Sequence, residues 1–339
     1  DRGTQSLLIY DRLTGEALRE VVAHRDGLPA AIHRANSHAS STVASDGQRV
    51  FALFYNRGGV WITAYTLAGE QLWQRRVGSF NPARYQFGFG SSPRVYDGKV
   101  IFATEFDGAS PGESGVFAVD AATGEPVWNA PRPSQLSYGT PAVATIGGRP
   151  QLLMSGNDLL GAYDAATGDA IWETPGSTMA SCGTMVWDES LGLAFASGGY
   201  PKDYTLAVRL GGDNEIVWQN TTRCYEQSLL AVGGYVYGVS NSGIAHCWRG
   251  EDGKRMWRRR LGGGFSSSPL LVGDRIYVTN EAGTTYVFEA NAQRFVRLAE
   301  NQLGDSAYAT PSVVGDRMYH RYAATEAGDR QEYLVALGE

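Results

Sequence analysis

A ten-residue pattern recurs along the chain and constrains the fold more than any other feature. Its two clearest copies are VDAATGEPVW at residues 119–128 and YDAATGDAIW at residues 163–172. Weaker copies lie at residues 10–18, 65–73, 208–218 and 248–257, and a worn copy lies at residues 288–296. Self-similarity of this kind indicates that one supersecondary unit is repeated along the chain.

A second motif precedes each copy of the turn pattern and sets the length of the unit. It consists of a small-residue pair, an apolar strand and then, in most copies, an Asp-Gly or Gly-Asp pair. Its copies recur with a mean step of about 45 residues, which is the length of one four-stranded propeller blade. Segments such as residues 275–279 alternate with the period of a strand, and the Gly pairs suit hairpin turns. We therefore predict an all-β propeller of four-stranded antiparallel blades.

The polar and aromatic residues of the turn pattern have a structural interpretation. An Asp side chain can bond the turn backbone, the Gly closes the turn, and the Trp reaches the outer strand, where it can bury a large area. We predict that these residues staple neighbouring blades and are not catalytic. They are Asp120, Gly124, Trp128, Asp164, Gly168, Trp172, Trp218 and Trp257.

The number of blades is open to two interpretations. We expect one propeller domain over residues 1–339, with a partial first blade in residues 1–23 and seven further repeats from about residue 39 to residue 339. The first unit shows only its last two strands, so its inner strands would precede the sequence. The main expectation is an eight-bladed ring whose first blade is incomplete in this chain. The alternative is a seven-bladed ring in which residues 17–22 close the last blade.

The AxDxxTGxxxW turn at residues 118–128 and 162–172 resembles the pyrroloquinoline-quinone-like (PQQ-like) repeat. Quinoprotein dehydrogenases, the outer-membrane assembly lipoprotein of the Bam complex and many exported propellers share this repeat. The segments HRANSHASS, GSSP and LGGGF, which start at residues 33, 90 and 261, look like uncharacterised exported propellers of planctomycetes. The resemblance implies this fold and export to the periplasm or cell surface. The sequence opens at Asp1 without a signal peptide, as a processed product would.

Cofactors and metals are not expected. Quinoprotein dehydrogenases resemble one another in a vicinal Cys-Cys disulfide over the quinone and in a calcium site of Glu, Asn and Asp. Here Cys182, Cys224 and Cys247 are not adjacent, and no equivalents of the calcium ligands can be assigned. The absence of CxxCH excludes attached haem, and the cysteine spacing indicates neither a zinc site nor a disulfide framework.

Net charge and hydropathy limit the classes of partner that we expect. The net charge of −6 argues against a nucleic-acid groove, which needs a basic face. The one basic cluster, residues 255–260, is interpreted as decoration of a strand. No run of apolar residues is long enough to span a membrane.

Candidate site residues lie just before the small-residue motifs, where a propeller would place them at one mouth of its central channel. They are His33, Arg34, Asn36, His38, Arg84, Tyr85, Tyr138, Arg223, Tyr225, Glu226 and Tyr308. Loops between inner strands add Glu105, Asp107, Tyr200, Asn280, Glu281, His320 and Arg321. Glu226 is expected to form an ion pair with Arg223. The spacing of His33 and His38 does not suit a metal chelate.

Three functions remain open. The main interpretation is an exported, non-catalytic scaffold that binds a protein partner in the cell envelope. The alternative is a polar small molecule or glycan bound in the central channel, where Arg and His contact oxygens and Tyr stacks on sugar faces. In the third, a His and a carboxylate perform acid-base catalysis on a glycan. Whether the protein is an enzyme is left open, with the expectation that it is not.

Overall fold

The alternating segments of the sequence form antiparallel strands in the computed structural model, which describes residues 3–29, 32–33, 36–83, 87–212 and 214–338. Every regular element in these residues is a β-strand, so the all-β prediction is confirmed. The chain divides into two compact units, Asp1–Cys182 and Gly183–Glu339. The single domain expected over residues 1–339 stays a prediction.

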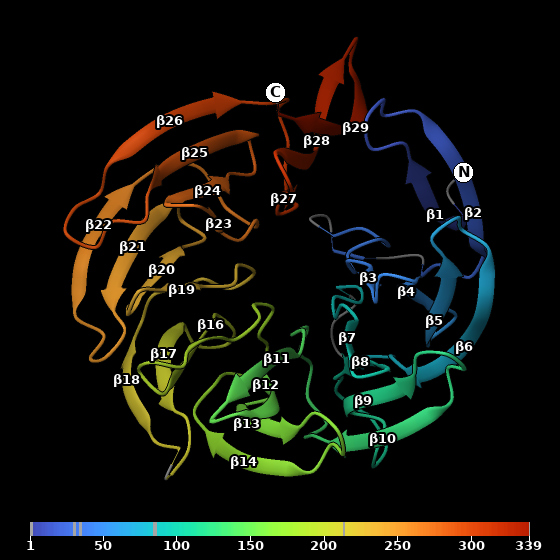
Figure 1. Cartoon of the computed structure of the whole chain (residues 1–339), viewed down its shortest axis with the longest axis horizontal. Coiled ribbons are helices and arrows are strands. Elements are labelled where there is room, and N and C mark those ends of the chain that lie inside the picture. Colours follow the sequence, from blue (N-terminus) through green and yellow to red (C-terminus); the bar gives the residue numbers. More distant parts are fainter. Residues whose placement is uncertain (1–2, 30–31, 34–35, 84–86, 213, 339) are drawn as a thin grey trace. The chain divides into compact units, whose positions relative to one another are not determined.

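Unit 1 (Asp1–Cys182) contains a two-stranded sheet and three four-stranded sheets (Figure 1). The two-stranded sheet is β1 (Thr4–Tyr10) and β2 (Ala17–Arg25). The second sheet is β3 (Ala44–Ser45), β4 (Arg49–Asn56), β5 (Gly59–Thr66) and β6 (Gln71–Ser79). The third is β7 (Arg94–Tyr96), β8 (Lys99–Thr104), β9 (Gly115–Asp120) and β10 (Pro126–Pro131). The fourth is β11 (Ala142–Ile146), β12 (Arg149–Gly156), β13 (Leu159–Asp164) and β14 (Ala170–Pro175).

Unit 2 (Gly183–Glu339) contains three four-stranded sheets and one three-stranded sheet. The first is β15 (Val186–Asp188), β16 (Leu193–Gly198), β17 (Tyr204–Arg209) and β18 (Ile216–Asn220). The second is β19 (Leu230–Val232), β20 (Tyr235–Val239), β21 (Ile244–Arg249) and β22 (Arg255–Arg260). The third is β23 (Leu270–Val272), β24 (Arg275–Thr279), β25 (Thr284–Glu289) and β26 (Arg297–Gln302). The last is β27 (Ser312–Val314), β28 (Arg317–Glu326) and β29 (Asp329–Leu337).

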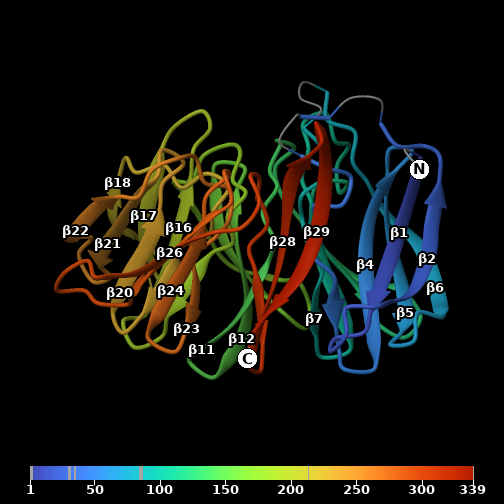
Figure 2. The ribbon, with the colours of Figure 1, turned by 90° about the horizontal axis from the view of Figure 1, so that it is seen from above.

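The blade count follows the alternative interpretation. Seven of the sheets have three or four strands, and they are the blades of a seven-bladed β-propeller. The main expectation of eight blades is not supported: β1 and β2 form the two-stranded sheet that was expected for the first unit, and this sheet is not counted as a blade. This sheet covers the neighbouring one instead: Leu7 and Val21 pack against Phe54 and Tyr65, and Figure 2 shows β1 and β2 beside β4, β5 and β6. Residues 17–22 belong to β2, which pairs with β1.

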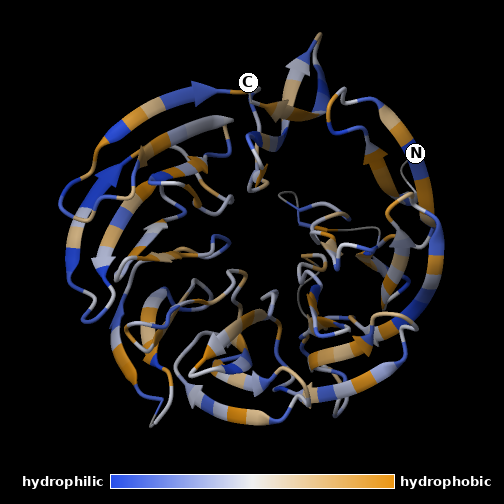
Figure 3. Cartoon of the chain, viewed as in Figure 1, coloured by the Kyte–Doolittle hydropathy of each residue, from blue (hydrophilic) through white to orange (hydrophobic). Residues whose placement is uncertain are grey.

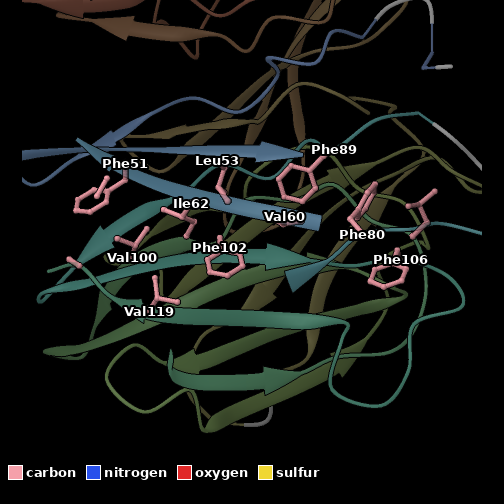
Figure 4. Close-up of a cluster of buried hydrophobic side chains, with 13 residues drawn as sticks. Phe51, Leu53, Val60, Ile62, Phe80, Phe89, Val100, Phe102, Phe106 and Val119 are labelled. Atoms are coloured by element: carbon pink, nitrogen blue, oxygen red, sulfur yellow. The ribbon is translucent and has the colours of Figure 1, made fainter. Parts of the chain in front are cut away.

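The core of unit 1 lies between sheets whose middle strands, such as β4 and β8, are buried over runs of consecutive residues. Phe51 and Ile62 of one sheet belong to the same buried cluster as Val100 and Phe102 of the next, and all four side chains are fully buried (Figure 4). Burying a side chain of this size stabilises the fold by about 1.5–3 kcal/mol. The packed sheets therefore hold the ends of the loops that join them.

The repeated turn is held by the carboxylate of its Asp. Asp120 Oδ1 accepts hydrogen bonds from the backbone N–H of Ala122 and Thr123, at 2.9 and 2.8 Å, and from the Thr123 hydroxyl at 2.9 Å. Asp164 accepts the equivalent backbone bonds from Ala166 and Thr167. The Thr123 hydroxyl, followed by the backbone donors, holds the pKa of Asp120 below its usual value even though slight burial acts to raise it. Asp164 Oδ2 also accepts a hydrogen bond from Arg149 of β12 at 2.7 Å. These carboxylates therefore have a structural use.

The Trp of one repeat packs over the Gly of the next. A Cβ built on Gly124, Gly168 or Gly253 would lie 2.6–2.7 Å from the ring of Trp73, Trp128 or Trp218, respectively. The Trp218 indole N–H also donates to the Gly250 carbonyl at 2.7 Å. Each pair joins two sheets within one unit.

Two tryptophans depart from that arrangement. Trp257 faces the worn copy of the turn, which lacks the Gly; its ring contacts the Phe295 ring at 5.4 Å, and its N–H donates to the Asn291 carbonyl at 2.8 Å. Trp172 is buried on β14, and no acceptor for its indole N–H lies in the described part of the chain.

Candidate functional site

Three loops of unit 1 meet at the ring of Phe87. The His33 ring lies edge-on to it at 5.4 Å, and the Tyr138 ring lies at 6.5 Å. The Asn36 side-chain amide donates a hydrogen bond to the Phe87 carbonyl. We call His33, Asn36, Phe87 and Tyr138 the aromatic loop cluster. Three of these four residues were candidates from the sequence, and Phe87 was not.

The aromatic loop cluster is accessible but held in place. His33 is exposed and Phe87 is 36% exposed, whereas Tyr138 is half-buried. The Tyr138 backbone N–H donates to the Ser181 carbonyl at 3.0 Å, and the Asn36 bond fixes the backbone at Phe87. The cluster therefore presents aromatic surface, and hydrogen bonds tie Asn36 to Phe87 and Tyr138 to Ser181.

The other candidates from these loops do not belong to the cluster as described. His38 is half-buried, its carbonyl accepts a hydrogen bond from Gln5, and burial lowers the pKa of its imidazole. Arg34, Arg84 and Tyr85 lie outside the described residues. Across the described residues, no three His, Cys, Asp or Glu side chains are grouped so that they could hold a metal ion.

In unit 2, a second candidate group surrounds Arg223. Its guanidinium carbon lies 5.2 Å from the centre of the Tyr225 ring, and its Nε is 3.8 Å from Asp203 Oδ1. The Tyr225 backbone N–H donates to Asn241 Oδ1 at 2.9 Å, which fixes this segment. The ion-pair partner of Arg223 is thus Asp203 and not the expected Glu226, which is exposed. We call Arg223, Tyr225 and Asp203 the Arg223 cluster.

Two further candidates belong to the last sheet of unit 2 and the segment before it. Tyr308 precedes β27 and is 41% exposed. His320 lies in β28 and is buried, and burial lowers the pKa of its imidazole. A buried His320 is closed to a substrate in this structure. The expected grouping of candidates from both units at one channel mouth stays a prediction.

Glu105 was expected in a loop at the channel mouth, but it forms a buried ion pair. Its Oε1 lies 2.5 Å from Arg132 Nε, and the two side chains are 1% and 0% exposed. Arg132 also donates to the Tyr163 hydroxyl at 2.6 Å and to the Gly156 carbonyl at 2.9 Å. Although burial alone would lower it, the pKa of Arg132 is raised by Glu105. Through its bonds to Tyr163 and Gly156, Arg132 links this ion pair, at the end of the β7–β10 sheet, to the β11–β14 sheet.

The remaining sequence candidates are used locally. Asn280 Oδ1 accepts backbone hydrogen bonds in its own turn, and Glu281 accepts a hydrogen bond from the Ser266 hydroxyl. Arg321 pairs with Glu332 at 2.7 Å. Asp107 accepts a hydrogen bond from the Ala83 N–H, and Tyr200 is 39% exposed.

Within the described residues, none of the three cysteines forms a disulfide. Cys224 and Cys247 are buried, and burial raises the pKa of each thiol to about 12. Both are therefore neutral thiols at ordinary pH and poor nucleophiles.

Comparison with known proteins identifies the family to which the chain is similar. The family model described as outer membrane protein assembly factor BamB matches residues 3–258 and 207–326. The crystal structure of BamB from Moraxella catarrhalis is 16% identical, with a TM-score of 0.68 over 93% of this chain and 88% of that one. A computationally designed protein, Ika8, is 10% identical, with a TM-score of 0.65 over 97% of this chain and 90% of that one. Identities this low show the fold alone.

No curated protein matches the chain. Within the described ranges, there is no helix of the length and hydropathy needed to cross a membrane.

Proposed function

Because the chain belongs to the family of the outer membrane protein assembly factor BamB, we propose that it is an exported, non-catalytic scaffold that binds a protein partner in the cell envelope. The PQQ-like repeats build its sheets, and the loops between the sheets carry the binding surface. The observation that supports this role most directly is the exposed ring of Phe87, flanked by His33 and Tyr138.

The aromatic loop cluster has the properties of a protein-binding anchor. Protein interfaces are enriched in aromatic residues, and a few such residues supply most of the binding energy. Binding also loses less entropy when the contacting group is already ordered. The Asn36 and Tyr138 hydrogen bonds provide that order for Phe87 and its neighbours.

Replacing Phe87 with serine is expected to reduce partner binding at least tenfold, since hot-spot truncations lower binding free energy by about 2 kcal/mol or more. The full chain, tagged and purified from the envelope of its own cells, would be compared with the Phe87→Ser variant by quantifying co-purified outer-membrane assembly proteins.

The matched control is Leu298→Ser, which removes a 45% exposed apolar side chain from β26, away from the aromatic loop cluster in the sequence. It should retain the partner, and both variants should keep the parent melting temperature. Equal recovery of partner with Phe87→Ser and with the parent chain would refute this role for the cluster.

The Arg223 cluster supports a second function, the binding of a polar small molecule or glycan. The Arg223 side chain is 45% exposed and lies over Tyr225. A guanidinium can bind a carboxylate through two parallel hydrogen bonds, and an aromatic ring offers a flat apolar face. A sugar acid fits both groups.

This second function predicts that glucuronate binds the full chain and that Arg223→Gln weakens the binding at least tenfold, because the charge-assisted bonds are lost. Saturation-transfer NMR and calorimetry would measure it. Arg209→Gln is the control, because Arg209 has the same exposure, 46%, and its own partner, Glu215. If both variants bind glucuronate equally, the cluster has no such role.

A further inference from the structure

β22 (Arg255–Arg260) is the most basic strand of the protein and forms an open edge. Its sequence is RMWRRR, and the strand order β19-β20-β21-β22 places it last in its sheet. The last strands of the other four-stranded sheets carry at most two arginines, as in β6, or one basic and one acidic residue, as in β26. Figure 3 shows β22 as predominantly hydrophilic.

The four arginines of β22 lack counter-charges. Arg255, Arg258, Arg259 and Arg260 are exposed, and within the described residues none of them forms an ion pair or a side-chain hydrogen bond. Many other surface arginines are paired: Arg75 with Glu125, Arg297 with Glu300, and Arg321 with Glu332. In a chain of net charge −6, this strand is a concentrated and uncompensated positive site.

The arginines project from both faces of the strand. Arg259 shares a face with Trp257, and its guanidinium carbon lies 5.9 Å from the Phe295 ring. Arg258 is paired in register with His246 of β21, whose ring stacks on Trp248 at 4.9 Å. Burial, followed by the charges of Arg255 and Arg258, lowers the pKa of His246 to about 4. The positive field of β22 therefore acts on its own sheet.

We propose that the open edge of β22 binds an extended acidic segment of a partner polypeptide by strand addition. The outer side of an edge strand presents backbone N–H and C=O groups that a further strand can pair with. Four arginines repel a second copy of β22, and they favour a strand with Glu or Asp opposite them. This edge is separate in sequence from the aromatic loop cluster, so the inference goes beyond the proposed function.

An acidic strand fits this edge better than an anionic membrane surface. A paired strand carries side chains on both faces and can place a carboxylate near each arginine. A flat surface meets one face and leaves the backbone groups unpaired. Trp257 is also unavailable to a membrane, because its indole N–H is bonded to the Asn291 carbonyl and its ring packs on Phe295.

The experiment measures binding of a fluorescent peptide of alternating Glu and Val to the full chain by anisotropy. We expect binding that weakens as salt is raised, because exposed charges are screened. The triple variant R255Q, R258Q and R260Q should bind at least about tenfold more weakly, since each exposed pair contributes a few-fold. Arg259 is left in place because it packs on Phe295.

Three controls make the result specific. Replacing the arginines that are paired on other strands, Arg75 and Arg297, with glutamine should leave the affinity unchanged. A Lys-Val peptide should not bind. A Glu-Val peptide methylated at alternate backbone nitrogens should bind at least tenfold more weakly, because it keeps the charges but loses the donors that pair with β22.

Three outcomes would overturn the inference: equal binding by the triple variant, equal binding of the methylated peptide, or binding of phosphatidylglycerol vesicles with none of the peptide. A melting temperature equal to that of the parent chain verifies that the triple variant is folded. The Phe87→Ser variant should bind the peptide normally, so failure of this inference and failure of the proposed function are distinguishable.

Discussion

Replacing Glu105 with alanine is expected to lower the free energy of unfolding by about 3–5 kcal/mol, because it leaves the Arg132 charge buried without its partner. The two side chains are 1% and 0% exposed, so water cannot replace the lost carboxylate unless the structure opens. Urea unfolding of the full chain at neutral pH, followed by tryptophan fluorescence, measures the change.

A double-mutant cycle separates the ion pair from the loss of packing. Arg132→Met leaves the Glu105 carboxylate buried, with Asn157 as its remaining side-chain donor at 2.6 Å. Glu105→Ala combined with Arg132→Met leaves neither charge in the interior. The combined variant should therefore be more stable than the sum of the single losses predicts, by about 0.5–3 kcal/mol. Strict additivity, or a loss below about 1 kcal/mol for Glu105→Ala, would contradict the claim that the buried Glu105–Arg132 ion pair is coupled and stabilises the fold.

The second large effect is expected at Trp218. Trp218→Ala should lower the free energy of unfolding by about 3 kcal/mol, the low end of the range for buried aromatic residues, because this ring is only partly buried. Trp218→Phe keeps most of the ring contact over Gly253 and loses the bond to the Gly250 carbonyl, so its loss should be about 1 kcal/mol.

Changing the facing glycine tests the same contact from the other side. A Cβ at Gly253, where φ is +70°, would lie 2.6 Å from the Trp218 ring. At Gly212, where φ is +82°, no atom lies within 4 Å of that position. Gly253→Ala should therefore destabilise the protein more than Gly212→Ala, which imposes only backbone strain. Equal losses would show that Trp218 does not pack tightly on the glycine.

Local features of the fold follow from the residues themselves. The Asp120 turn needs only donors two and three residues further along the chain, so its pattern predicts its structure. The mean spacing of the motifs similarly predicts four-stranded antiparallel sheets, and the sheets confirm it. The number of blades depends on pairings between distant segments. β1 and β2 form the two-stranded sheet that the sequence led us to expect, but a turn motif does not show whether such a pair makes a further blade.

The parts of the site that the sequence did not predict depend on contacts between distant loops. Glu105 follows β8 and Arg132 follows β10 of the same sheet, and neither belongs to a motif, so their pairing depends on how the ends of these strands are placed. Phe87 is the first residue of an FGFG segment, and the second aromatic residue of this segment, Phe89, is buried. The composition of the segment therefore does not tell which of the two rings is exposed.

The proposed scaffold role is tested most directly by in-cell crosslinking at Phe87. A photoreactive phenylalanine analogue would replace Phe87 in the full chain, and in a second strain it would replace Leu298. Illumination of intact cells should crosslink the first protein to an outer-membrane assembly protein and leave the second without that product. The same crosslinked product from both positions, or none from Phe87, would contradict the proposal that the aromatic loop cluster binds a protein partner.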